Sequence, residues 1–126
     1  MMPVKRTDKP NKSDIPRVLL VDDHEIIRTG LRLFLGSKGI DVIGECSDAA
    51  SALDEVIRLQ PDVVLLDVYL PDQSGIEACV EIRDAAPTVK ILILTGSEDS
   101  ATEFAAIYAG AHGYLPKTGR MDDLIP

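Results

Sequence analysis

The run Val18-Leu19-Leu20-Val21 carries a short apolar segment directly into the carboxylates of Asp22 and Asp23. The run Val63-Val64-Leu65-Leu66 does the same for Asp67. Short runs of Val, Leu and Ile are typical of strands buried on both faces, and such strands occur in parallel sheets. Two further apolar runs also end in polar side chains: Ile91-Leu92-Ile93-Leu94 reaches Thr95, and Gly113-Tyr114-Leu115 leads to Lys117.

Strand and helix patterns alternate along the chain. After the first apolar run, Ile27, Leu31, Phe34 and Leu35 recur at the spacing of one helix face. The alternation continues to the end of the sequence without an internal repeat. We expect strands near 17–22, 40–46, 62–67, 90–94 and 113–115, and helices near 24–36, after 48, after 75 and near 99–109.

The second and third helices have recognisable boundaries. Ser47 and Asp48 are candidates to cap the second helix, and Pro61 ends it. The turn at 71–75 opens the third helix. The apolar stripe predicted for the second helix is Leu53, Val56 and Ile57.

Alternating strands and helices predict an α/β fold, with a parallel sheet covered by helices on both faces. Right-handed crossovers restrict the topology, and strand order 2-1-3-4-5 would make the first and third strands neighbours. Asp22, Asp23 and Asp67 would then face one another at the carboxyl edge of the sheet, where ligands of such sheets collect. Three carboxylates, a hydroxyl and an ammonium group together suit a divalent metal and a phosphoryl group.

The size and charge of the chain exclude some functions. Its 126 residues are typical of one domain with a core large enough to fold without disulfides. The net charge is −8, but residues 1–14 carry +2, which leaves −10 for the remainder. An acidic body is a poor nucleic-acid binder, because the phosphate backbone requires a basic face. Any contact with DNA must therefore come from another domain.

The first 14 residues are polar and contain Pro3 and Pro10, which predicts a disordered lead or an expression remnant. They lack the apolar segment of a signal peptide, and no stretch approaches the ~18 apolar residues of a membrane span. Cys46 and Cys79 are far apart and lack the spacing of metal ligands. We expect both to be buried, reduced thiols of a cytoplasmic protein.

Three crowded carboxylates indicate a cation, because their mutual repulsion is costly without one. Oxygen donors without a histidine cluster favour Mg²⁺ over zinc. In the alternative interpretation, Asp22 or Asp23 only caps the first helix, where negative charge is favourable. That alternative leaves Asp67 unexplained.

Asp67 is the candidate nucleophile, because a carboxylate oxygen can accept a phosphoryl group and form an acyl phosphate. Lys117 would hold a phosphoryl oxygen, and the hydroxyl of Thr95 would bond to the transferred group. Each residue also has an ordinary interpretation. Asp67 and Thr95 can be turn residues, and most lysines are solvated surface charges.

The same residues, in order and spacing, resemble the motifs of a receiver domain of bacterial two-component response regulators. The resemblance covers residues 15–118 and rests on several motifs in register. The segment from Asp22 through Arg28 to Leu31 further resembles the LuxR/FixJ-like branch of these regulators. The resemblance implies a flavodoxin-like (βα)5 doubly wound sheet. The matching stretches are VLLVDDH at 18–24, LLDVYLPDQSG at 65–75, which contains Asp67 and Gly75, TG at 95–96 and GYLPK at 113–117.

The resemblance assigns a role to each matching residue. Asp67 corresponds to the phosphoacceptor that receives its phosphoryl group from a histidine of a sensor kinase. Asp23 corresponds to the direct Mg²⁺ ligand and Asp22 to the ligand that acts through water, and the backbone carbonyl of Tyr69 completes the site. Three more residues have counterparts: Thr95 as the switch hydroxyl, Lys117 as the phosphate-binding lysine, and Tyr114 as the aromatic that turns inward on activation.

Two features depart from the usual receiver pattern. Thr118 follows Lys117 where many receivers have proline, and here Pro116 comes before the lysine instead. The last helix is also expected to be curtailed, since the sequence ends at Pro126. We therefore expect residues 15–126 to form a receiver domain with a truncated last helix, cut before a linker and a DNA-binding output domain.

The leading hypothesis is a phosphorylation-activated switch that controls transcription through a helix-turn-helix domain absent from this sequence. It is not an enzyme beyond phosphorylation and dephosphorylation of its own Asp67. Its expected partner is a sensor histidine kinase, a homodimer is left open, and no membrane contact is expected. One alternative is an aspartyl-phosphate phosphatase, although Asp67-Val68-Tyr69 lacks the usual Asp-x-Asp. The other is an adaptor that works without phosphorylation. His24 and His112 lack spaced partners and are interpreted as a helix-start and a loop residue.

Overall fold

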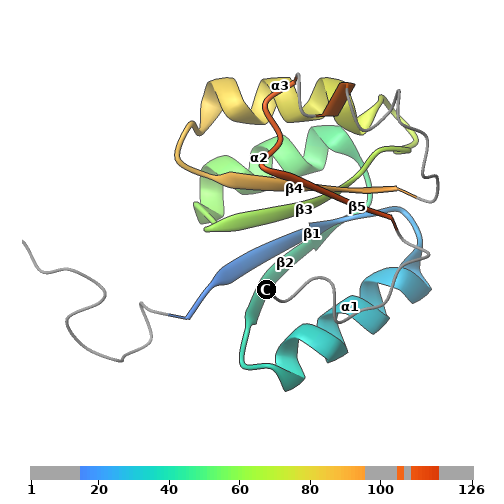
Figure 1. Ribbon diagram of the computed structural model, residues 1–126, viewed down its shortest axis with the longest axis vertical. Coiled ribbons are helices and arrows are strands. Elements are labelled where there is room, and N and C mark those ends of the chain that lie inside the picture. The colour runs from blue at the N-terminus through green and yellow to red at the C-terminus, as the bar shows by residue number, and fades with distance from the viewer. Residues whose placement is uncertain (1–14, 96–104, 107–108, 117–126) are drawn as a thin grey trace, which may run out of the picture.

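The computed structural model describes residues 15–95, 105–106 and 109–116, and the strands among them form one sheet in the order β2-β1-β3-β4-β5 (Figure 1). All four strand pairings are parallel. The predicted α/β fold and its strand order are thus confirmed. The strands are β1 (Arg17–Val21), β2 (Asp41–Cys46), β3 (Val63–Asp67), β4 (Lys90–Thr95) and β5 (Gly113–Pro116).

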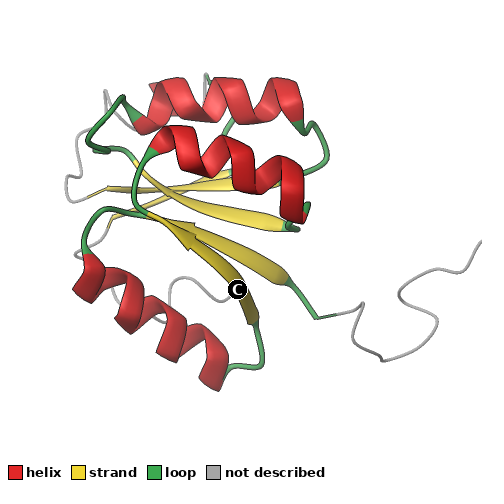
Figure 2. Ribbon diagram, turned by 180° about the vertical axis from the view of Figure 1, so that it is seen from behind, coloured by secondary structure: helices red, strands yellow, loops and turns green. Residues whose placement is uncertain are grey.

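Among the described residues, three complete helices cover the sheet on two sides. Helices α2 (Ala49–Leu59) and α3 (Gly75–Ala85) lie over one face, and α1 (Glu25–Ser37) lies over the other (Figures 1 and 2). This layering follows from right-handed crossovers between parallel strands. The predicted helix near 99–109 is described only at 105–106, which are helical. The truncated last helix predicted from the sequence lies outside the described residues, as do Thr118 and the lead predicted at residues 1–14.

The central strands β1 and β3 are buried on both faces along most of their length, as their composition predicts, whereas the edge strand β2 is partly exposed. Leu19 and Val21 point into the core beneath α2 and α3, whereas Val18 and Leu20 belong to the cluster beneath α1. All four are at most 4% exposed. Burial of apolar surface stabilises a fold by about 25 cal/mol per Å². The burial of these side chains is therefore the main contribution that holds the layers together.

The helix stripes follow the sequence with one exception. In α1, Leu31 and Leu35 are buried, and Ile27 and Phe34 pack against the same cluster. In α2 the predicted stripe is wrong at Ile57, which is 53% exposed. Leu53 and Val56 of that stripe do pack in the core, and small alanines rather than Ile57 complete the buried face of α2. Its buried residues are Ala49, Ala52 and Val56.

The helix ends are capped largely as predicted. The Asp48 carboxylate accepts the Ser51 N–H at the start of α2, and the Ser74 hydroxyl accepts the Ile76 N–H at the start of α3. Helix α2 ends with Gln60 in the left-handed region at φ 51°, directly before Pro61. Both cysteines are free and buried, as expected. Among the described residues, no helix combines the length and the apolar character needed to cross a bilayer.

Candidate functional site

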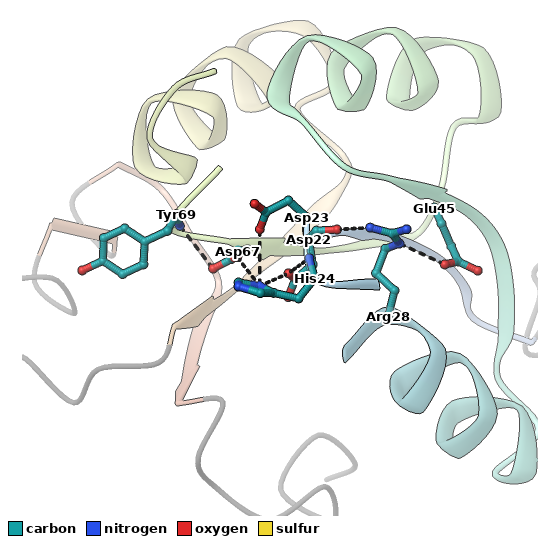
Figure 3. Close-up of polar contacts among 7 residues, drawn as sticks. All are labelled: Asp22, Asp23, His24, Arg28, Glu45, Asp67 and Tyr69. Carbon is teal, nitrogen blue, oxygen red and sulfur yellow. Dashed lines mark hydrogen bonds and ion pairs between the residues drawn. The ribbon is translucent and has the colours of Figure 1, made fainter. Parts of the chain in front are cut away.

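The register of β1 and β3 brings three carboxylates together at the carboxyl edge of the sheet. Val21 pairs with Leu66, so that the residues that follow them, Asp22 and Asp67, lie side by side. Each of these two aspartates is only 1% exposed, whereas the neighbouring Asp23 side chain is 38% exposed. Figure 3 shows all three at one end of the sheet. The predicted convergence of Asp22, Asp23 and Asp67 is what the structure shows.

His24 is part of the same cluster. Its Nδ1 lies 2.7 Å from Asp22 Oδ1, 3.3 Å from Asp23 Oδ1 and 3.8 Å from Asp67 Oδ2 (Figure 3). Its backbone N–H also donates to Asp22 Oδ1 at 2.8 Å. His24 is the N-cap position of α1, so its interpretation as a helix-start residue is confirmed. The direction of the His24 ring was not predicted from the sequence, although the position of His24 directly after the two aspartates could have indicated it.

Donor atoms from these four side chains could surround one metal ion. One ligand atom from each of Asp22, Asp23, His24 and Asp67 lies within 4.8 Å of all the others. Ligands of a small divalent ion stand about 3 Å apart when each lies roughly 2.1 Å from the metal. Carboxylate oxygens suit Mg²⁺, and an imidazole nitrogen adds a donor that suits transition metals. The donor set therefore fits a divalent cation.

The backbone that follows β3 also contacts the Asp67 carboxylate. The Tyr69 N–H donates to Asp67 Oδ1 at 3.1 Å, which fixes the orientation of the carboxylate. The Tyr69 ring is 60% exposed and points away from the cluster (Figure 3). Tyr69 thus contacts Asp67 through its backbone N–H, and the role of its carbonyl as a metal ligand stays a prediction.

Gly75 closes the loop that follows Asp67. Its N–H donates to the Val68 carbonyl at 2.6 Å, and Tyr69 bridges to Ser74 across the loop. A β-carbon on Gly75 would stand 2.0 Å from the Asp67 carbonyl oxygen, well inside contact distance. Only glycine lets the start of α3 approach β3 this closely. This close approach sets the backbone path on which Tyr69 lies.

Arg28 supports the β1–α1 turn from α1. Its guanidinium donates to the Asp22 backbone carbonyl and, at 3.1 Å, to Glu45 Oε1 of β2. Arg32 donates to the other oxygen of Glu45 at 2.7 Å. Burial acts to raise the pKa of Glu45, but the hydrogen bonds from Arg32 and Arg28 outweigh it, and this pKa lies below its usual value. Glu45 therefore stays ionised and keeps Arg28 aimed at the acidic cluster.

The remaining predicted site residues are described only in part. Thr95 ends β4 at the same edge of the sheet as Asp67, and Tyr114 pairs with Ile93 in β5. Nothing is described of either side chain. Lys117 lies outside the described residues, although Pro116, which comes directly before it, pairs with Thr95.

Comparisons with known proteins agree with this geometry. Residues 18–126 match the family model of the response regulator receiver domain. The DNA-binding transcriptional activator DevR/DosR of Mycobacterium tuberculosis is 44% identical over 102 residues, which are 80% of this chain and 47% of that protein. A LuxR-family two-component response regulator from Aurantimonas sp. SI85-9A1 superposes with a TM-score of 0.84 at 38% identity, covering 88% of this chain and 80% of that one.

One further solved structure carries chemical information. A response regulator from Burkholderia pseudomallei was crystallised with a phosphorylated aspartic acid, a calcium ion and citrate. It is 26% identical, has a TM-score of 0.80, and matches over 87% of this chain and 64% of its own. This chain spans about half the length of the curated relatives it matches. The family match over residues 18–126, the strand order and the acidic cluster agree, and the chain belongs to the response regulator receiver domain family.

Proposed function

We propose that this chain is a phosphorylation-activated switch of two-component signalling. A sensor histidine kinase would present a phosphohistidine to the acidic cluster, and Asp67 would receive its phosphoryl group. An oxygen of Asp67 forms the new bond to phosphorus, while the bond from phosphorus to the imidazole nitrogen breaks and its electron pair stays on that nitrogen. The product is an acyl phosphate on Asp67 and a histidine released on the kinase.

The observation that carries this proposal is the placement of Asp67. It is a carboxylate 1% exposed at the carboxyl edge of a parallel sheet, with Asp22, Asp23 and His24 around it. A buried carboxylate beside two others is costly unless its charge is used or compensated. The Tyr69 N–H holds one of its oxygens, which orients the carboxylate for attack.

The cation would be held by the carboxylates and by the loop after β3. In this proposal Asp23 binds Mg²⁺ directly, Asp22 acts through water, and Asp67 and the backbone carbonyl of Tyr69 complete the set. The ion supplies neutralisation of the charge on the transferring phosphoryl oxygens. The phosphorylated aspartic acid and calcium ion in the Burkholderia pseudomallei regulator support this assignment.

The response to phosphorylation is assigned to the β4–β5 side. Thr95 would bond to the phosphoryl group, Lys117 would hold another of its oxygens, and Tyr114 would turn inward as Thr95 moves. Thr95 pairs with Pro116 and Ile93 pairs with Tyr114 across β4 and β5, so the backbones of Thr95 and Tyr114 belong to neighbouring strands on this side of the sheet. A ligand shifts such an equilibrium only through its different affinity for the two states, and the phosphoryl group supplies that difference.

The output is assigned to transcription. DevR/DosR is a DNA-binding transcriptional activator, and the part of it that matches this chain is less than half its length. We assign residues 1–14 to a lead, residues 15–126 to the receiver, and DNA binding to a helix-turn-helix domain beyond this sequence. The protein would act in the cytoplasm, with a second copy of itself as a further candidate partner.

The test is transfer from a small phosphodonor. The chain is incubated with acetyl phosphate in Mg²⁺, and its intact mass is measured with and without a metal chelator. The proposal predicts one added phosphoryl group in Mg²⁺, little in chelator, and little in the Asp23→Asn variant. Equal phosphorylation with and without the chelator would contradict the proposal. Continuous hydrolysis of a phosphate ester would favour the phosphatase alternative.

A further inference from the structure

We propose that Asp72 is a positioning residue that ties the loop after β3 to the N-terminus of α2, and that this tie sets the affinity for the divalent ion. Asp72 lies in the loop of residues 68–74 that connects Asp67 to α3. The inference rests on the proposed function, because it concerns the backbone that would complete the metal site. Asp72 itself does not touch the ion or the phosphoryl group.

The contacts of Asp72 reach across the surface to another element. Its Oδ1 accepts the Ala49 N–H at 2.9 Å, and its Oδ2 accepts the Ala50 N–H at 3.0 Å. Both carboxylate oxygens are therefore engaged by the first turn of α2. The pKa of Asp72 lies below its usual value, chiefly because of the bond from Ala49 and then that from Ala50. The Asp72 carboxylate is thus ionised at neutral pH, where it can accept both hydrogen bonds.

Helix α2 already has a cap of its own. Asp48 accepts the Ser51 N–H at 2.7 Å, and its backbone carbonyl accepts the Ala52 N–H. Residues directly before a helix commonly cap it in this way. Asp72, by contrast, lies more than 20 positions after the helix start whose N–H groups it accepts. Its two hydrogen bonds therefore connect the loop after β3 to α2, in addition to capping the helix.

The loop that Asp72 ties down is the one that carries the proposed ligand. Its base is held by the Tyr69–Ser74 bridge and by the Gly75 N–H on the Val68 carbonyl. Pro71 and Asp72 at its tip are exposed, and the contact of Asp72 with α2 lies at the surface. Holding the tip against α2 restricts the motion of the Tyr69 backbone, and a ligand that is already in place binds an ion more tightly.

The experiment compares two cap variants of the same helix in the 126-residue chain. Asp72→Ala removes the bonds between the loop and α2, whereas Asp48→Ala removes the helix's own cap and leaves the loop tied. Mg²⁺ affinity is measured by calorimetry, and the amide exchange rates of residues 69–74 by mass spectrometry. We expect Asp72→Ala to weaken Mg²⁺ binding about tenfold, the lower end of the range for groups that orient metal ligands.

Asp72→Ala should also speed exchange in the loop, and its labelling rate should return to the wild-type value at saturating Mg²⁺. Asp48→Ala should lower thermal stability and leave Mg²⁺ affinity unchanged. Asp72→Asn keeps one acceptor oxygen and should recover part of the affinity. Wild-type Mg²⁺ affinity in Asp72→Ala, or an equal loss in Asp48→Ala, would overturn the inference. A wild-type chain that binds no Mg²⁺ would instead overturn the proposed function, and this inference with it.

Discussion

The carbonyl oxygen of Asp67 occupies the space that a β-carbon of Gly75 would need, with only 2.0 Å between the two positions. The same β-carbon would stand 2.9 Å from the Val68 α-carbon. These neighbours are backbone atoms, so no side chain can rotate away to make room. The start of α3 therefore depends on glycine at this position.

Gly75→Ala should destabilise the domain by about 1–3 kcal/mol or more, as overpacked sites do, because β3 and α3 must move apart. It should also disturb the Tyr69 backbone and weaken Mg²⁺ binding. Gly36→Ala in α1 is the matched control, since nothing lies within 4 Å of its added β-carbon. That variant should gain roughly 0.5–1 kcal/mol from the higher helix propensity of alanine. Urea unfolding of both variants checks the prediction, and equal behaviour of the two would contradict it.

Arg28 should contribute more to stability than a surface arginine does. Its side chain is 17% exposed and bonds to both Asp22 and Glu45. Arg28→Ala leaves two acceptors without their donor, and we expect a loss of about 1–3 kcal/mol. Arg58→Ala is the control, because the Arg58–Glu55 pair is solvent-exposed within α2 and should matter little. The prediction fails if chemical unfolding shows the two arginine variants to be equally stable.

His24 should decide how the cluster ranks divalent ions. Its Nδ1 lies 2.7 Å from Asp22 Oδ1 and within 4.8 Å of all three carboxylate ligand atoms. An imidazole nitrogen favours Ni²⁺ or Zn²⁺ far more than Mg²⁺. His24→Asn should therefore weaken Ni²⁺ binding at least about tenfold and change Mg²⁺ binding little. Calorimetric titration with both ions tests this, with His112→Asn as a control that should alter neither. An equal loss for both ions would show that His24 is not selective.

His112 should make stability depend on pH. Its Nδ1 accepts the Ile91 N–H at 3.1 Å, which requires the neutral ring. Burial first, and then the charges of Lys90 and Arg83, hold the pKa of His112 below its ordinary value of 6.5. The unfolded chain therefore binds a proton at a higher pH than the folded chain does. The contribution of neutral His112 to the free energy of unfolding is therefore complete above about pH 6.5. It is lost as the pH falls through the lower pKa that His112 has in the folded chain.

The measurement is urea unfolding of wild type and His112→Asn at pH 7.5 and pH 5.5. The Asn side-chain oxygen can accept the Ile91 N–H without titrating. The fall in unfolding free energy between the two pH values should therefore be smaller in the variant. An unchanged fall would mean that other groups account for the pH dependence of stability.

The sheet could be predicted because the core of each central strand is a short, continuous run of apolar residues in the sequence. The four residues at 18–21 and the three at 64–66 are buried, and parallel strands of this kind permit few topologies. Once strands one and three are neighbours, Asp22 and Asp67 must meet at the edge. The acidic cluster is therefore a consequence of topology and needs no knowledge of side-chain packing.

The contacts that could not be predicted from the sequence depend on where individual side chains point, and most of them join residues far apart in the chain. The ring of His24, the tie from Asp72 to α2 and the bond from Arg28 to Glu45 depend on rotamers and on how two elements sit together. Periodicity in the sequence does not record either. Ile57 shows the same limit within a helix, because a one-position change in the buried face separates a core residue from an exposed one.

The identity of the phosphorylated residue tests the central claim most directly. The wild-type chain and the Asp67→Asn variant are incubated with acetyl phosphate and Mg²⁺, and their intact masses are followed over time. Asn keeps the size of the side chain but lacks the nucleophilic carboxylate. We predict that the wild-type chain gains one phosphoryl group and that the variant gains none. A variant labelled as fast as the wild type would place the nucleophile at another residue and contradict the account.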